Sequence, residues 1–107
     1  MITVCRIEDL PPGESFRVTE GVPAPVAVFH TEDGEFYAID DTCTHQDASL
    51  ADGWLEGCYV ECPLHTALFD LRTGFPTCLP AKTPVRTHQV SVQNGQVLLH
   101  VSVAEPA

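Results

Sequence analysis

Cys43-Thr44-His45, followed after sixteen residues by Cys62-Pro63-Leu64-His65, is the stretch on which the interpretation of this chain depends. Each half offers one thiolate and one imidazole on a short segment. A 2Fe–2S cluster with one iron held by two cysteines and the other by two histidines needs this set of donors. Because cysteine comes first in both halves, each segment can give one ligand to each iron. The pattern therefore predicts a mixed-ligand 2Fe–2S cluster bound by Cys43, His45, Cys62 and His65.

Two other interpretations use the same residues. Zinc also accepts two cysteines and two histidines, but zinc modules usually pair like ligands, as in Cys-x-x-Cys followed by a pair of histidines. A disulfide between Cys43 and Cys62 would leave both histidines unexplained, and disulfides are rare in a reducing cytosol. The cluster is therefore the favoured interpretation, and a structural zinc module that mediates protein contacts is the main alternative.

Composition indicates one small, acidic domain. The 107 residues carry 5 Lys and Arg against 15 Asp and Glu, which gives a formal net charge of −10. This balance argues against nucleic acid and anionic membranes as partners, since both attract basic patches, and it favours brief docking on positively charged proteins. No apolar run approaches the roughly 18 residues of a membrane span, and the N-terminus lacks a signal-peptide pattern. We expect a cytoplasmic protein.

Short runs rich in β-branched and aromatic residues alternate with turn residues along the chain, which predicts an all-β fold. Asp33-Gly34 and Asn94-Gly95 each separate two such runs and predict β-hairpins. No sustained helical period is present, and residues 46–52 are expected to form at most one irregular turn. The predicted strands cover residues 2–6, 15–19, 25–30, 35–39, 58–61, 67–70, 87–92 and 96–103. The predicted single domain, 1–107, divides into a base (1–41 and 71–107) and a smaller cluster-binding subdomain (about 42–70).

Other polar, aromatic and sulfur-containing residues are interpreted as structural. Trp54 is expected to be a turn residue packed against the cluster-binding subdomain, with a role as a partner anchor as the alternative. None of the remaining histidines falls at ligand spacing, and we expect them at the surface or half buried. Acidic residues before the first ligand segment fit either a turn or an acidic docking face. The remaining histidines are His30, His88 and His100, and the acidic residues are Asp40 and Asp41. The non-ligand cysteines are Cys5, Cys58 and Cys78.

Beyond the four ligands, the chain resembles the small Rieske ferredoxins of bacterial ring-hydroxylating dioxygenase systems over nearly its full length. The resemblance rests on residues 34–41, Cys43-Thr44-His45, residues 52–57, residues 60–65 and residues 69–74. It implies the Rieske fold, with stacked antiparallel sheets and a cluster-binding subdomain at one tip. It also implies one Rieske 2Fe–2S cluster, with Cys43 and Cys62 on the inner iron and His45 and His65 on the outer iron.

The same resemblance implies a role in electron transfer. Such ferredoxins carry single electrons from a flavin-dependent, NADH-oxidising reductase to a terminal Rieske oxygenase. The chain itself shows no nucleophile–base pair, phosphate-binding loop or paired catalytic carboxylates, so we do not expect it to transform a substrate alone. The alternative within this fold is the small subunit of an NADH-dependent nitrite reductase.

Two departures from respiratory members of the superfamily bear on the reduction potential. Ala48 and Leu64 stand where those members carry two further cysteines joined in a disulfide. Ala67 and Phe69 stand where they carry hydroxyl groups near the cluster sulfurs. Because hydrogen bonds to the sulfurs stabilise the reduced state, their absence predicts a potential near the low end of the Rieske range, about −150 mV.

Overall fold

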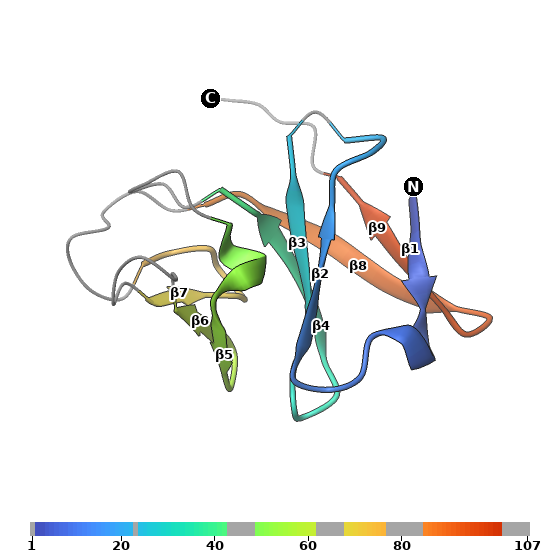
Figure 1. Cartoon of the computed structure of the whole chain (residues 1–107), viewed down its shortest axis with the longest axis horizontal. Helices are drawn as coiled ribbons and strands as arrows, with labels where there is room; N and C mark the ends of the chain where they lie inside the picture. Colours follow the sequence, from blue (N-terminus) through green and yellow to red (C-terminus); the bar gives the residue numbers. More distant parts are fainter. Residues whose placement is uncertain (1, 23, 43–48, 62–67, 77–84, 102–107) are drawn as a thin grey trace.

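The computed structural model describes residues 2–22, 24–42, 49–61, 68–76 and 85–101. Nine strands and two short 3₁₀ turns make up the described part of the chain. Six strands form one antiparallel sheet in the order β1-β9-β8-β4-β3-β2, and the other three form a small sheet in the order β5-β6-β7 (Figure 1). This all-β architecture of antiparallel sheets confirms the predicted fold class.

The elements follow one another along the chain with short connections. In the large sheet they are β1 (Ile2–Arg6), β2 (Glu14–Val18), β3 (Val26–His30), β4 (Phe36–Asp40), β8 (Thr87–Gln93) and β9 (Gln96–His100). In the small sheet they are β5 (Trp54–Glu56), β6 (Tyr59–Glu61) and β7 (Leu68–Asp70). The 3₁₀ turns are η1 (Ile7–Asp9) and η2 (Leu50–Asp52). None of the helical segments among the described residues is long and apolar enough to cross a membrane.

Both predicted hairpins are present. β3 and β4 pair from Val26↔Asp40 to His30↔Phe36 across the Asp33-Gly34 turn. β8 and β9 close at Gln93↔Gln96 around Asn94 and Gly95, whose φ angles are 52° and 75°. Positive φ at both central residues is the geometry of the turn that matches strand twist, and Asn-Gly is its preferred sequence.

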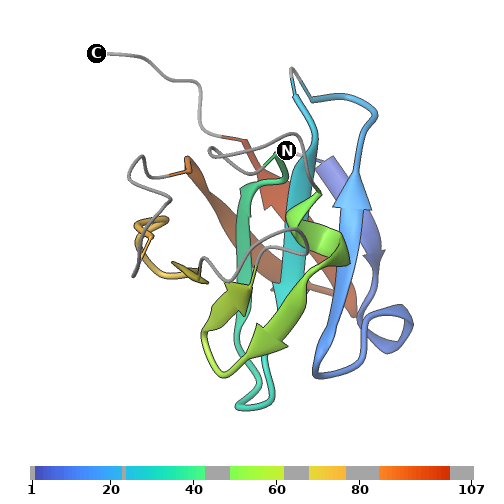
Figure 2. The ribbon, with the colours of Figure 1, turned by 60° about the vertical axis from the view of Figure 1, so that its left-hand side comes forward.

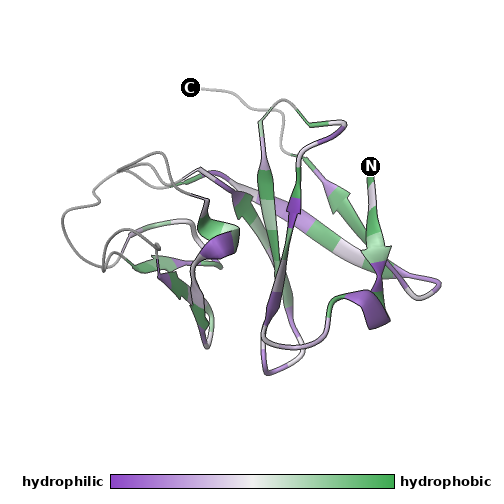
Figure 3. Ribbon diagram, in the orientation of Figure 1, coloured by the Kyte–Doolittle hydropathy of each residue, from purple (hydrophilic) through white to green (hydrophobic). Residues whose placement is uncertain are grey.

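β3 separates two buried clusters of apolar side chains. Alternate residues of a strand face opposite sides of the sheet, and all five residues of β3 are buried. Val26 and Val28 pack with Leu10, Val97 and Leu99 inside the large sheet. Ala27 and Phe29 pack on the other side, beneath the small sheet. Apolar colour accordingly runs along β3 in Figure 3. The second cluster comprises Ala27, Phe29, Ile39, Leu50, Val60, Phe69, Leu71 and Val85.

η2 contacts β2 and β3, and the small sheet lies on the same side of the large sheet (Figures 1 and 2). The expected irregular turn is present where the structure describes it, as η2. The interpretation of Trp54 as a packed turn residue is wrong, because Trp54 begins β5 and its side chain is 59% exposed. The division into a base and a cluster-binding subdomain stays a prediction.

Candidate functional site

The four predicted ligands lie outside the described residues, in segments 43–48 and 62–67, and so does Cys78. What the structure describes is the pair of anchors that bounds each segment. Thr42 and Ser49, on either side of the first segment, form an isolated antiparallel bridge. Glu61 and Leu68, on either side of the second, are paired as the last contact between β6 and β7. Each segment of six residues therefore begins and ends at a closed pair of backbone positions, and each contains one cysteine and one histidine.

A third segment, 77–84, also has a backbone contact on each side, although its two flanking residues do not pair with each other. Pro76 forms a bridge with Phe69, and the amide of Val85 donates to the carbonyl of Gly74 across 2.8 Å. A Cβ added to Gly74 would collide with the carbonyl oxygen of Val85. Phe69 therefore belongs to β7, which begins directly after the second ligand segment, and also helps to close the third.

The anchors of all three segments rest on one apolar cluster. Leu50 follows the first anchor, Val60 and Phe69 lie at the second, and Val85 lies at the third; all four are at most 4% exposed and share the cluster beneath the small sheet. Their contact brings the anchors of the three segments together at one apolar cluster. Burial of side chains of this size stabilises by about 1.5–3 kcal/mol each relative to leaving them exposed.

The first two anchors also meet through the backbone. The chain passes from Ser49 through η2 to Gly53, and Trp54 pairs with Glu61 at the start of β5. A Cβ on Gly53 would overlap the carbonyl oxygen of Glu61, so only a glycine lets the two backbones approach this closely. Gly53 thus holds the chain that follows the first ligand segment against Glu61, the residue directly before the second.

A single carboxylate, that of Asp41, organises the first anchor. Its Oδ1 accepts hydrogen bonds from the hydroxyl of Ser49 at 2.8 Å and from the amide of Ala51 at 2.9 Å. Its main-chain carbonyl accepts from the amide of Leu50 at 2.7 Å. Asp41 is 1% exposed. The interpretation of Asp41 as part of an acidic docking face is therefore wrong.

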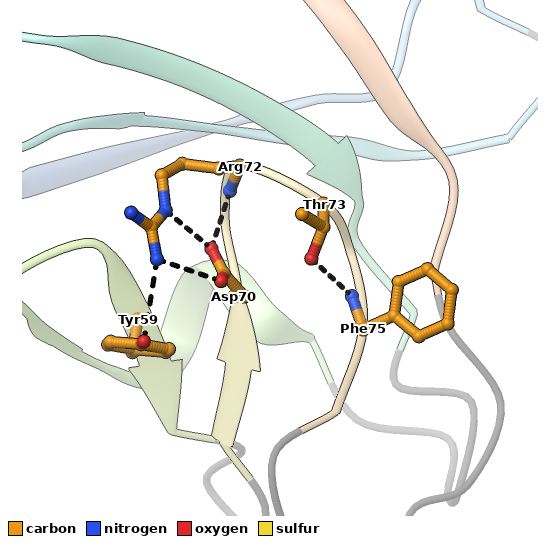
Figure 4. Close-up of polar contacts among 5 residues, drawn as sticks. All are labelled: Tyr59, Asp70, Arg72, Thr73 and Phe75. Atoms are coloured by element: carbon orange, nitrogen blue, oxygen red, sulfur yellow. Dashed lines mark hydrogen bonds and ion pairs between the residues drawn. The ribbon is translucent and has the colours of Figure 1, made fainter.

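A second carboxylate, that of Asp70, shapes the turn after β7 (Figure 4). Arg72 donates through Nε to Oδ1 and through Nη2 to Oδ2, each at 3.0 Å, and its amide also donates to Oδ1. The guanidinium lies 5.9 Å from the centre of the Tyr59 ring. These hydrogen bonds from Arg72 hold the pKa of Asp70 below its ordinary value, and the same pair raises the pKa of Arg72. Charge and hydrogen bonds thus fix the turn that leads to the third segment.

Two of the three histidines outside the motif, His30 and His88, are more buried than predicted. His30 is 8% exposed, donates through Nδ1 to the Leu10 carbonyl at 2.7 Å, and stacks on Phe36. The His88 side chain is 2% exposed, and its Nε2 lies 2.8 Å from Asp40 Oδ1. Both belong to strands of the large sheet, His30 to β3 and His88 to β8. His100 is half buried and contacts Ser91.

The two described non-ligand cysteines, Cys5 and Cys58, are free thiols with intermediate exposure. Burial, with the nearby charge of Asp9 as the smaller cause, raises the pKa of Cys5. Cys5 packs at the edge of the cluster inside the large sheet, and Cys58 lies in the turn between β5 and β6. Within the described ranges, no group of three or more His, Cys, Asp and Glu side chains could hold a metal ion.

Sequence reasoning missed Arg17, Ser49 and Gly53 as contributors to the site. Arg17 lies on β2, far from the motif in sequence, and its Nε reaches within 3.0 Å of Asp41 Oδ2. No local pattern identifies such a partner. Gly53 had a usable signal, since a glycine beside a strand often marks a close backbone approach.

Comparison with known proteins agrees with this arrangement. The family model described as the Rieske [2Fe-2S] domain matches residues 1–89. The 3-phenylpropionate/cinnamic acid dioxygenase ferredoxin subunit of Photorhabdus laumondii is 50% identical over 100 residues, which cover 92% of each chain.

Solved structures of similar fold include a ferredoxin of a dioxygenase system. A chain of the complex of reduced oxygenase and oxidised ferredoxin in carbazole 1,9a-dioxygenase is 41% identical, with a TM-score of 0.85 over 92% of this chain and 99% of that chain. A protein proposed to be the small subunit of an NADH-dependent nitrite reductase from Mycobacterium tuberculosis also has a TM-score of 0.85, but it is 20% identical and shows the shared fold alone. The chain belongs to the Rieske [2Fe–2S] family and is a ferredoxin with one Rieske cluster, an electron-carrying component of an aromatic-ring dioxygenase system that is not itself the catalytic enzyme.

Proposed function

We propose that Cys43 and Cys62 bind the inner iron and that His45 and His65 bind the outer iron of the cluster. The donor set fits, since Rieske centres replace two of four cysteines by histidines on one iron. The anchors support the assignment as well, because each ligand segment is bounded by paired residues and the anchors share one apolar cluster. The cluster supplies a one-electron couple. The chain's own residues hold the two segments in place around it.

The proposed direction of transfer is from a flavin-dependent, NADH-oxidising reductase to the terminal oxygenase. The carbazole dioxygenase structure pairs a ferredoxin with an oxygenase, which supports the second partner by likeness. The relative at 50% identity belongs to a phenylpropionate and cinnamate system. We therefore propose an oxygenase for aromatic acids of that class as the electron acceptor, in the cytoplasm.

The net charge of −10 suits this role. Complementary charge raises the rate at which two proteins meet, and salt weakens it over a Debye length of about 8 Å at physiological ionic strength. An acidic carrier must dissociate from each partner after it transfers one electron. Complementary charge raises its rate of association without requiring a large apolar interface. Trp54 and Phe75, each 59% exposed, stand beside the second and third anchors and are the apolar contacts available there among the described residues.

Low-temperature electron paramagnetic resonance of the dithionite-reduced protein, with iron and sulfide counted on the same sample, tests the ligand assignment. We expect a rhombic signal with an average g below the free-electron value and equal iron and sulfide. Substituting any one of the four ligands by alanine should abolish that signal, whereas Cys58→Ala should retain it. Retention of the signal in a ligand variant would overturn the assignment. A silent sample that contains zinc would overturn the electron-transfer function.

A further inference from the structure

Asp41 is the one acidic side chain among the described residues that is almost fully buried, at 1% exposed. It immediately precedes Thr42, whose bridge to Ser49 closes the first ligand segment. Its amide donates to the Pro25 carbonyl at 2.9 Å, its carbonyl accepts from Leu50, and its Oδ1 accepts from both Ser49 and Ala51. The residue therefore connects the start of β3 to both sides of the first anchor.

The second carboxylate oxygen has a different environment. Oδ2 accepts no hydrogen bond from the described part of the chain, although it is fully buried. Among the described residues, Arg17 supplies the opposite charge: its Nε lies 3.0 Å from Oδ2, and its side chain is 52% exposed. A buried carboxylate is costly unless an opposite charge compensates it. Arg17 supplies that compensation from β2, at the edge of the large sheet.

β2 contacts the same anchor a second time without charge. The hydroxyl of Ser15 donates to the carbonyl of Ala51 at 2.7 Å. Ser15 and Arg17 are two residues apart and face the same side of the strand. One strand thus contacts η2 through a neutral hydrogen bond and Asp41 through an ion pair, which allows the two contributions to be separated by substitution.

We propose that Asp41 and Arg17 are a positioning pair that both seats the first ligand segment and sets the reduction potential of the cluster. This inference rests on the proposed assignment of Cys43 and His45 as ligands. Reduction adds one negative charge to the cluster, so the fixed charge of Asp41 opposes it and the charge of Arg17 favours it. The potential is therefore tuned from β2, a strand that contains none of the four ligands.

The size of the effect follows from chain geometry. Two residues span at most about 7 Å, which limits the distance between the Cα atoms of Asp41 and Cys43. At a separation on the order of 10 Å and an effective dielectric of about 20 to 40, one unit charge changes a one-electron equilibrium about fourfold to sixteenfold. At 59 mV per tenfold change, this corresponds to a shift of about 35 to 70 mV. The half-exposed charge of Arg17 should act in the opposite direction and more weakly.

The test compares five variants of the full chain with the wild type by spectroelectrochemical titration, with iron counted per chain. Asp41→Asn keeps an oxygen acceptor for Ser49 and Ala51 and should raise the midpoint potential. Arg17→Gln should lower it, Arg17→Lys should leave it near the wild-type value, and the double variant of Asp41→Asn with Arg17→Gln should also return toward it. Ser15→Ala, the neutral control, should lower iron retention under denaturant without shifting the potential.

The outcomes separate the inference from the proposed function. If the wild type gives the Rieske spectrum and Arg17→Gln leaves the potential unchanged, the inference is wrong and the function stands. Shifts of the same sign in Asp41→Asn and Arg17→Gln would show loss of structure instead of charge and would also overturn it. If Asp41→Asn fails to retain iron, the seating role is supported. The electrostatic role is then decided by whether Arg17→Gln lowers the potential while Arg17→Lys leaves it near the wild-type value. A wild type without the spectrum would instead refute the proposed function.

Discussion

Replacing Gly53 by alanine tests whether the two ligand segments depend on one close backbone contact. Gly53 has a φ of −82°, which any residue adopts without strain, so the effect of a methyl group there is purely steric. The added Cβ would overlap the carbonyl oxygen of Glu61 and lie 3.1 Å from its carbonyl carbon and 3.3 Å from the Leu50 carbonyl oxygen. These are backbone atoms on two sides of Gly53, so no side-chain rotation relieves the overlap. β5 and β6 must separate, or η2 must move.

Overpacking of this kind costs about 1–3 kcal/mol, and we expect the upper end because the colliding atoms are backbone. The assay is chemical unfolding of the oxidised protein, followed by loss of the visible cluster absorption and by circular dichroism. The matched comparison is Gly57→Ala, in the turn between β5 and β6, where φ is 60° and no atom lies within 4 Å of an added Cβ. That variant has only the left-handed backbone strain, about 1–2 kcal/mol. Gly53→Ala should lose its cluster at lower denaturant than Gly57→Ala. The reverse order would refute the steric argument.

Two further predictions follow from the described contacts, and a third follows from the proposed ligand assignment. Phe69→Ala removes a fully buried ring and should cost about 3–5 kcal/mol of unfolding free energy, whereas Phe75→Ala, at an exposed position, should stay within about 0.5 kcal/mol. Arg72 lowers the pKa of Asp70 in the folded protein. The stability that this pair contributes is therefore present at neutral pH. It is lost as the pH falls, first below about 4, where Asp70 of the unfolded chain takes up a proton, and then below the lowered pKa of the folded protein. The stability difference between wild type and Asp70→Asn should therefore narrow from pH 7 to about pH 3, and a constant difference would contradict it. His45→Cys should lower the potential sharply or remove the Rieske spectrum, because thiolate adds negative charge at the outer iron, and an unchanged titration would contradict the assignment.

Local patterns predicted most strands of the large sheet within a residue or two. The hairpins at Asp33-Gly34 and Asn94-Gly95 are specified by turn residues that accept positive φ, and the flanking strands are rich in β-branched side chains. Such information lies within a few consecutive residues. The assignment of the four proposed ligands also rests on spacing, since two mixed Cys and His pairs have few chemical explanations, and it stays a prediction.

What the sequence did not reveal depends on contacts between distant segments. Trp54 follows Gly53 and resembles a turn residue, but pairing with Glu61 draws it into β5. His88 is buried because β8 pairs with β4, and its Nε2 lies 2.8 Å from Oδ1 of Asp40. Arg17 and Asp41 are separated by 24 positions, and only the arrangement of β2 beside η2 brings them together. Sequence spacing alone does not indicate that two such distant residues are in contact.

Asp41 shows how this chain can hold its first ligand segment without a covalent link. The sequence has alanine at 48 and leucine at 64, so the disulfide that the resemblance to respiratory members of the superfamily would place at these positions cannot form, and another constraint must limit the separation of the ligand segments. Among the described residues, that constraint is distributed over the bridge at Thr42, the contact of Gly53 with Glu61 and the buried carboxylate of Asp41. A disulfide is neutral, whereas a buried carboxylate adds a negative charge near the cluster and thereby disfavours reduction. The same anchor that replaces the covalent link therefore also lowers the potential. A low potential is the direction expected of a carrier placed between a nicotinamide-fed reductase and an oxygenase.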